Sequence, residues 1–243
     1  MRGIDMIYVI GDLHGCYQTY LEAMRQIQLS DDDTLYVLGD MIDRGKDGIK
    51  ILQDMSMRCN VIALLGNHEY MALQVLERFC VEINEDNYET HLTTDDFYAY
   101  QLWMENGGQP TIEAFMQLSN EDKFAILDYL NDCPLYEEVQ LQNQTYLLVH
   151  AGIVPYQKDN ALEYYQPINF IFQSNQEDEF PFTMICGHTP TFTYGSIYEN
   201  KIYQKNQRIN IDCGLVYGKN LAVYCLDTQK VIYIDNQEVN ENG

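Results

Sequence analysis

The apolar residues of the chain fall into short runs that end at a glycine or a histidine and are followed by polar residues. The first three runs lie at residues 6–10, 35–38 and 61–65, and the segments between them, 16–27 and 46–57, carry apolar residues at helical spacing. Short runs rich in β-favouring residues that stop at a glycine indicate buried strands. The pattern therefore predicts a β-α-β-α-β unit whose right-handed crossovers give a parallel sheet.

Helical spacing continues beyond the third strand. We expect a helix over 69–79 and a loop or cap over 81–96. Three short helices then follow, at residues 97–105, 111–117 and 121–130. Ser119, three residues before Asp122, has the form of a capping box for the last of them. We interpret residues 81–133 as a helical insert and expect it to shape the substrate surface.

The second half of the chain reads as strands and loops. Residues 135–141 and 145–149 flank a turn and predict an antiparallel hairpin, whereas the tyrosine-rich stretch 155–180 predicts a long loop. Further short strands are expected at residues 182–186, 197–198, 201–204, 208–211, 221–226 and 231–234. These elements predict a second sheet packed on the first with helices outside both, a four-layer α/β/β/α sandwich. We expect one domain over residues 1–243, with a frayed end at 236–243.

The composition limits the kinds of binding partner and indicates the cellular compartment. Asp and Glu number 37 against 14 Lys and Arg, a formal net charge of -23, which argues against nucleic acid held in a basic groove and against an anionic membrane surface. Seven cysteines stand singly, and no apolar stretch approaches the roughly 20 residues that span a bilayer. Scattered cysteines without a signal peptide predict reduced thiols and a cytoplasmic protein. We expect Cys186 and Cys213 to pack as small apolar residues rather than to act as ligands.

The candidate chemistry lies in the loops after the strands. The second strand leads into Gly39-Asp40-Met41-Ile42-Asp43-Arg44-Gly45, with two carboxylates and a guanidinium close together. Taken alone, this loop is equally well interpreted as a solvated turn without a function. Four of the five histidines also stand at strand ends, with His91 as the exception. These four are His14, His68, His150 and His188. Ligands of open α/β sheets bind at the carboxyl ends of the strands, so the joint placement favours a functional site.

The donor types of this set suit divalent transition metals. Two Asp, one Asn and three His offer the oxygen and imidazole donors that bind Mn, Fe or Zn. Asp12 and His14 alternate along extended chain, so both side chains face one way and can hold one ion. Asp40 can bridge this ion to a second one held by three further residues, Asn67, His150 and His188. Only two ligand charges then oppose the charge of two divalent ions, which leaves the site cationic enough to attract a phosphate.

Five motifs occur in the order of a known family: GDLHG, GDMIDRG, GNHE, LVHAG and CGHTP. The series resembles the phosphoprotein phosphatases within the calcineurin-like metallophosphoesterases, in particular the small bacterial serine/threonine phosphatases and the symmetrical diadenosine tetraphosphatases. The resemblance extends from Met6 to the segment 211–214. It implies the ligand division given above and two divalent metal ions, with manganese expected first and Fe or Zn as alternatives.

The resemblance also implies catalytic roles. Asp43 is expected to orient His68, the general acid that protonates the leaving alcohol, while Arg44 holds the phosphoryl oxygens. Arg44, Asn67 and His68 together form the expected phosphate-binding set. The implied nucleophile is a hydroxide that bridges the two metals.

One expectation from the resemblance is not met. An arginine between the two late histidine motifs is absent, since none occurs between Arg78 and Arg208. The stretch 170–173 reads Phe-Ile-Phe-Gln where similar phosphatases tend to carry Trp-Ile-Arg. Lys158 is the only basic residue of the loop over 155–180, which makes it a weak candidate for a substitute.

Three functions follow from these residues. We expect first the hydrolysis of phosphate monoesters, with phosphoserine or phosphothreonine on a protein as substrate. The alternative enzyme is a symmetrical bis(5'-nucleosyl)-tetraphosphatase, which acts on a small nucleotide substrate. A non-catalytic phosphate-recognition module is the alternative from another class, motivated by the missing arginine. Trp103, the only tryptophan, is expected to pack in the core rather than to stack on substrate.

Overall fold

Two five-stranded mixed sheets lie at the centre of the computed structural model, which describes residues 5–81, 84, 92–175 and 179–238. The first sheet has the order β10 (Lys230–Ile234), β9 (Leu221–Cys225), β1 (Ile7–Ile10), β2 (Thr34–Val37) and β3 (Val61–Ala63). The second has the order β4 (Tyr136–Leu141), β5 (Gln144–Val149), β6 (Thr183–Cys186), β8 (Arg208–Asn210) and β7 (Tyr203–Lys205). Strands β1, β2 and β3 are parallel, as are β5, β6 and β8, so their carboxyl ends meet at one edge.

The buried apolar side chains form three layers, and successive residues of a strand point into different layers. Tyr8 and Ile10 pack toward the helices on the first sheet, whereas Val9 between them packs between the two sheets. In β5, Leu148 also faces the first sheet, while Leu147 and Val149 pack on the outer face of the second. A strand exposes successive side chains on opposite faces, so each of these strands is buried on both sides. The predicted four-layer α/β/β/α sandwich is confirmed.

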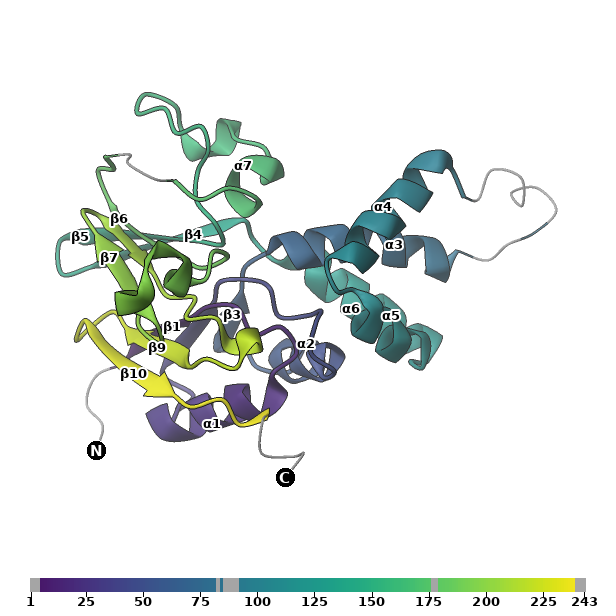
Figure 1. Ribbon diagram of the computed structural model, residues 1–243, viewed down its shortest axis with the longest axis horizontal. Coiled ribbons are helices and arrows are strands. Elements are labelled where there is room, and N and C mark those ends of the chain that lie inside the picture. Colours follow the sequence, from purple (N-terminus) through teal and green to yellow (C-terminus); the bar gives the residue numbers. More distant parts are fainter. Residues whose placement is uncertain (1–4, 82–83, 85–91, 176–178, 239–243) are drawn as a thin grey trace.

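The helices cover the outer faces of the sheets. They are α1 (Tyr17–Ile27), α2 (Gly48–Ser56), α3 (Asn67–Cys80), α4 (Thr94–Glu105), α5 (Gln109–Met116), α6 (Asn120–Asp132) and α7 (Pro167–Ile171). Figure 1 shows α1 and α2 beside the first sheet and α7 beside the second. Helices α3 to α6 gather at one side of the molecule (Figure 1) and share the apolar layer of the first sheet through side chains such as Trp103 and Phe115.

Several sequence predictions differ from the structure. Residues 197–198 belong to the 3-10 turn Ser196–Tyr198 and not to a strand. The stretch predicted as a loop over 155–180 contains α7, a helix too short to show a periodic pattern. Strands β9 and β10 extend the first sheet instead of the second, because β9 pairs with β1. Helix α4 begins inside the loop predicted over 81–96.

Parts of three predicted segments lie outside the described residues. These parts are residues 82–83 and 85–91 of the loop predicted over 81–96, residues 176–178 of the loop predicted over 155–180, and residues 239–243 of the predicted frayed end. Among the helices that the structure describes, none is both long enough and apolar enough to cross a bilayer.

Candidate metal and phosphate site

The loops after β1 and β2 pack back to back, which brings their polar side chains together. The backbone N–H groups of Leu13 and His14 donate to the Asp40 carbonyl oxygen at 2.9 and 2.8 Å. A Cβ atom added to Gly45 would lie 2.3 Å from the His14 carbonyl oxygen, so only glycine permits this approach. The glycines of the two motifs thus fix the distance between the loops.

Several candidate site residues adopt a left-handed backbone conformation. These residues are His14, Asp40, Asp43, Arg44 and His188, with φ between 44° and 69°. Such a conformation costs on the order of 1–3 kcal/mol for a residue other than glycine and persists only where the surroundings impose it. Its concentration in these loops marks them as a functional region of the chain.

Glu69 ties the second and third loops together. Its Oε2 accepts from the backbone N–H groups of Asp40 and Gly66 at 2.8 and 3.1 Å, and its Oε1 accepts from that of Met41 at 2.8 Å. Burial raises its pKa to about 7, against the lowering effect of these hydrogen bonds. No role was predicted for Glu69 from the sequence, although an acidic residue in the first turn of a helix after a glycine signals a capping interaction.

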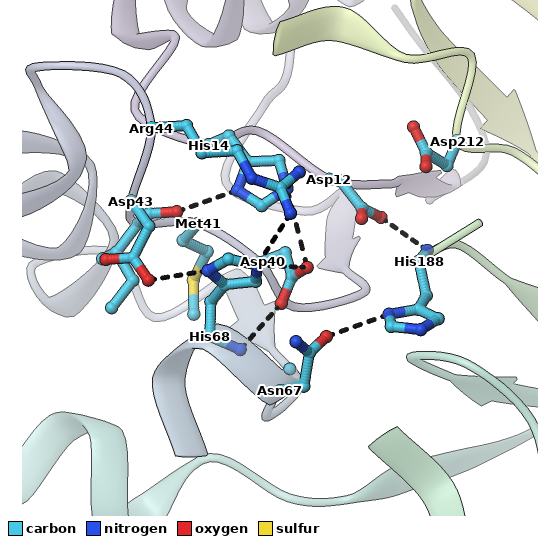
Figure 2. A network of polar contacts seen from close by, with 12 residues as sticks. Asp12, His14, Asp40, Met41, Asp43, Arg44, Asn67, His68, His188 and Asp212 are labelled. Atoms are coloured by element: carbon cyan, nitrogen blue, oxygen red, sulfur yellow. Dashed lines mark hydrogen bonds and ion pairs between the residues drawn. The ribbon is translucent and has the colours of Figure 1, made fainter. Parts of the chain in front are cut away.

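Asp40, His150 and His188 form a first group whose ligand atoms all lie within 4.8 Å of one another. His150 Nε2 lies 3.4 Å from Asp40 Oδ1 and 3.1 Å from His188 Nδ1. Asn67 Oδ1 lies 3.0 Å from His150 Nε2 and 2.9 Å from His188 Nδ1. The structure therefore brings together the four residues predicted for the second metal and its bridge (Figure 2, where Asp40, Asn67 and His188 are labelled).

A second group shares Asp40 and contains His14 and His68. His14 Nε2 lies 3.6 Å from Asp40 Oδ2, and His68 Nε2 lies 3.9 Å from the same oxygen. Asp12 is not a member of either group. Its Oδ1 accepts from the backbone N–H of His188 at 2.9 Å, which places it at the same site (Figure 2).

Two backbone carbonyls orient the imidazoles of the groups. His14 Nδ1 lies 3.0 Å from the Ile42 carbonyl oxygen, and His150 Nδ1 lies 2.7 Å from that of Leu38. A carbonyl only accepts, so each Nδ1 carries the proton and each Nε2 presents a lone pair to the site. Imidazoles that ligate metals are oriented in this way by their other nitrogen.

The charge state of the buried groups suits a cation. Burial and the neighbouring carboxylates of Asp212 and Asp40 raise the pKa of Asp12, and burial followed by Glu69 raises that of Asp40. Burial lowers the pKa values of His14 and His150, so both imidazoles are neutral. Neutral imidazoles with free lone pairs beside crowded carboxylates are the donor set that a divalent ion stabilises.

Asp212 is a further buried carboxylate that the sequence analysis did not single out as a site residue. It is 4% exposed, and burial raises its pKa to about 6. Figure 2 shows it beyond Asp12. It follows β8 at the same edge of the sheet as the other loops, so the rule that identified them also applies to Asp212.

Asp43 and His68 form a buried pair. His68 Nδ1 lies 2.6 Å from Asp43 Oδ2, so the structure brings together the two residues predicted to form this pair. Trp103 Nε1 donates to the same oxygen at 2.7 Å, and the Thr111 hydroxyl donates to Asp43 Oδ1 at 2.6 Å. Trp103 is fully buried, which confirms its predicted packing in the core and excludes stacking on substrate. Thr111 was missed because a single threonine in an amphipathic helix gives no signal.

Arg44 contacts both histidines of the second group. Its guanidinium donates to His14 Nε2 at 2.9 Å and to His68 Nε2 at 3.1 Å (Figure 2 labels all three residues). It also reaches the Tyr217 hydroxyl at 3.3 Å. In the structure the guanidinium thus satisfies imidazole lone pairs rather than an anion. Burial followed by Arg44 and His188 lowers the pKa of His68 to about 3.

Comparisons with known proteins place this chain among phosphoesterases. A family model described as calcineurin-like phosphoesterase matches residues 6–218. Serine/threonine-protein phosphatase 2 of Salmonella typhimurium is 27% identical over 90% of this chain and 91% of its own length. A symmetrical bis(5'-nucleosyl)-tetraphosphatase of Coxiella burnetii is 29% identical over 61% of this chain, but the match spans only 42% of that relative.

Solved structures share the fold at low sequence identity. A crystal structure of a "putative diadenosine tetraphosphatase" superposes with a TM-score of 0.65 at 16% identity, covering 100% of this chain and 96% of the other. A serine/threonine phosphatase from Saccharomyces cerevisiae superposes with a TM-score of 0.54 at 14% identity, covering 95% and 80%. Both likenesses concern the arrangement of the sheets and helices.

Proposed function

The chain belongs to the calcineurin-like phosphoesterase family, and from this premise we propose that it is a serine/threonine protein phosphatase that hydrolyses phosphate monoesters with two divalent metal ions. The observation that carries the proposal is the pair of ligand groups sharing Asp40, with Arg44 and the Asp43–His68 pair beside them. Metal ligands, an anion-binding guanidinium and a proton donor are the three parts that phosphate ester hydrolysis needs.

The residues present fit the metal ions. His150 Nε2 and His188 Nδ1 lie 3.1 Å apart beside the Asn67 oxygen, an arrangement of acceptors that a cation would satisfy. One ion would be held by Asp40 together with Asn67, His150 and His188. Asp40, His14 and Asp12 would hold the other. Bound there, manganese ions would lower the pKa of a water that serves as nucleophile and would offset the charge of the phosphoryl group.

Arg44 and His68 would act on the substrate directly. A phosphoryl oxygen offers the guanidinium a charged acceptor in place of the imidazole nitrogens that it contacts in the structure. Loss of that contact leaves His68 Nε2 free to carry a proton, since Asp43 already accepts from Nδ1. As the ester P–O bond breaks, the leaving oxygen takes the proton from Nε2, and an alcohol and inorganic phosphate result.

The segment that lacks the expected arginine contacts other residues of the site. The Phe172 backbone carbonyl accepts a hydrogen bond from His188, and the Phe172 ring packs edge-on against Tyr70 with centroids 6.1 Å apart. This segment therefore supports a ligand instead of offering a cation. Lys158 is exposed and stays a candidate for the second phosphate contact.

Two observations bear on the substrate. The relative that matches over nearly its whole length, at 91%, is named a protein phosphatase, whereas the tetraphosphatase of Coxiella burnetii matches over 42%. These coverages favour a phosphorylated protein. Diadenosine tetraphosphate, cleaved symmetrically to two ADP, is the second candidate, because several relatives are named symmetrical bis(5'-nucleosyl)-tetraphosphatases.

A side-by-side assay tests the proposal. The manganese-loaded protein is given a phosphoserine peptide, p-nitrophenyl phosphate and diadenosine tetraphosphate, with Asp40→Asn as the inactive variant and Asp128→Asn, an exposed site on α6, as the matched control. We expect turnover of the peptide and the nitrophenyl ester that Asp40→Asn lowers at least about 100-fold and Asp128→Asn leaves unchanged.

The products separate the alternatives. Preferential formation of ADP from diadenosine tetraphosphate would move the protein to nucleotide hydrolysis. Absence of turnover on all three substrates, with metal bound, would contradict the enzyme assignment and favour a phosphate-recognition module.

A further inference from the structure

Helices α4 and α5, with the turn between them, reach from the side of the molecule to Asp43, the partner of the proposed proton donor. These elements, residues 94–116, are part of the helical insert predicted over residues 81–133. Its Trp103 is fully buried and its Thr111 is 2% exposed, and the polar atoms of both side chains are directed at Asp43. Because buried polar groups are costly without partners, these two contacts are specific features of the insert rather than incidental packing.

Thr111 holds Asp43 at two points. Its hydroxyl donates to Asp43 Oδ1 at 2.6 Å and accepts from the Asp43 backbone N–H at 2.9 Å. Asp43 has a left-handed backbone, with φ of 69°, so its carboxylate direction is set by such contacts and not by a regular element. One hydroxyl therefore fixes the backbone and the side chain of Asp43 relative to each other.

Trp103 acts on the other oxygen of the same carboxylate. Its Nε1 donates to Oδ2 at 2.7 Å, and His68 Nδ1 contacts the same Oδ2 at 2.6 Å. The indole N–H thus determines where Oδ2 lies when it accepts from the imidazole. With both oxygens held, the carboxylate plane is fixed, and with it the direction in which His68 Nε2 faces.

The turn of the insert also contacts Arg44. The Arg44 backbone N–H donates to the Gly107 carbonyl oxygen at 2.9 Å, and a Cβ atom added to Gly107 would lie 2.8 Å from Arg44 Cγ. A Cβ atom on Gly108 would lie 2.6 Å from Trp103 Cε2. The two glycines thus let one turn pack against Arg44 and the indole together.

We propose that Trp103 and Thr111 are positioning residues for the reaction, which hold His68 Nε2 toward the leaving oxygen by fixing both oxygens of Asp43. The inference rests on the proposed function, in which His68 is the proton donor. Neither residue touches the substrate. The helical insert, beyond shaping the surface, sets the efficiency of proton transfer.

The dependence of the rate on the leaving group tests this role. A poor leaving group such as phenol needs the proton, whereas p-nitrophenol leaves more easily without it. The variants are Thr111→Val, which removes only the hydroxyl function, Trp103→Phe, which removes the indole N–H, and Thr111→Ser, which keeps the hydroxyl. Phe115→Leu, fully buried in the same α5 and without a polar atom, is the packing control.

We expect Thr111→Val and Trp103→Phe to lower kcat on phenyl phosphate by about 10-fold and kcat on p-nitrophenyl phosphate by less than about 3-fold. The loss on phenyl phosphate should be smaller than the roughly 100-fold or greater contribution of a general acid, because His68 itself is still present. KM should stay within about twofold, and Thr111→Ser should recover most of the rate on phenyl phosphate. The ratio of the two rates is internal to each variant, so a partly unfolded preparation does not alter it.

His68→Asn separates failure of the inference from failure of the proposed function. If this variant loses no more on phenyl phosphate than on p-nitrophenyl phosphate, His68 is not the acid and the proposed mechanism fails. The inference is wrong if His68→Asn loses more rate on phenyl phosphate but Thr111→Val and Trp103→Phe lose rate equally on both esters. Phe115→Leu should show such an equal loss, and Thr111 and Trp103 would then only support packing.

Discussion

His68 is the residue on which the proposed chemistry depends most. Asp43 accepts from its Nδ1, and its Nε2 faces Arg44 and the Asp40 carboxylate. By distance alone, His68 is also a member of a possible ligand group with His14 and Asp40. We assign it the acid role because the Asp43 carboxylate, unlike a backbone carbonyl, stabilises a positively charged imidazolium and so opposes the lowering of the His68 pKa by burial and by Arg44.

Replacing His68 distinguishes an acid from a ligand. His68→Asn should lower kcat on a phosphoserine peptide by about 100-fold or more, the contribution of a general acid, and leave manganese content unchanged. Steady-state rates and metal analysis of the same preparation check this. Loss of one equivalent of manganese in this variant would instead make His68 a ligand.

Residue patterns revealed some site residues and not others. Asp12, Asp40 and the four histidines stand where apolar runs stop, so their positions follow from the sequence. Thr111 and Trp103 contact Asp43 across about 60 residues or more of chain, and only the packing of the insert shows this. Their neighbours in the sequence carry no sign of the contact.

At the scale of elements, α3 links the loops through Glu69 at its first turn. The side chain is fully buried and accepts from backbone N–H groups of the loops after β2 and β3. Those loops carry Asp40 and Asn67, so the helix start and the candidate ligands form one unit. A carboxylate that accepts several backbone N–H groups holds them more firmly than an amide can, because an amide has one oxygen.

Glu69→Gln should therefore destabilise the protein. One amide nitrogen would face backbone donors, and the free energy of unfolding should fall by about 2–3 kcal/mol. Chemical denaturation measures the change, with Glu77→Gln, exposed on the same α3, as the matched control. A fall no larger than that of the control would mean that the loops do not depend on Glu69.

Elements with a clear pattern were predicted well, and pairing partners were not. Strands β1, β2 and β3 and helices α1 and α2 follow from apolar runs and helical spacing. Helix α7 was missed because five residues do not complete a periodic pattern, although Phe170 and Ile171 are buried. The position of β9 beside β1 depends on contacts more than 200 residues apart in the chain, which local pattern does not encode.

At the scale of the whole molecule, the charge of -23 opposes an anionic substrate. The field of the molecule repels phosphate, so attraction has to come from charges at the site itself. Arg44 contributes one positive charge, and the buried carboxylates around it contribute negative ones. The proposed function therefore requires two divalent ions, because without them the site would not attract a phosphate ester.

Metal stoichiometry tests that claim most directly. Metal-free protein is titrated with manganese at neutral pH, and bound metal is measured after equilibrium dialysis for the wild type and Asp40→Asn. We predict two manganese ions per chain for the wild type and at most one for Asp40→Asn, because the shared carboxylate serves both ions. Saturation of the wild type at one ion or none, or two ions bound with unchanged affinity in Asp40→Asn, would contradict a site in which Asp40 bridges two metal ions.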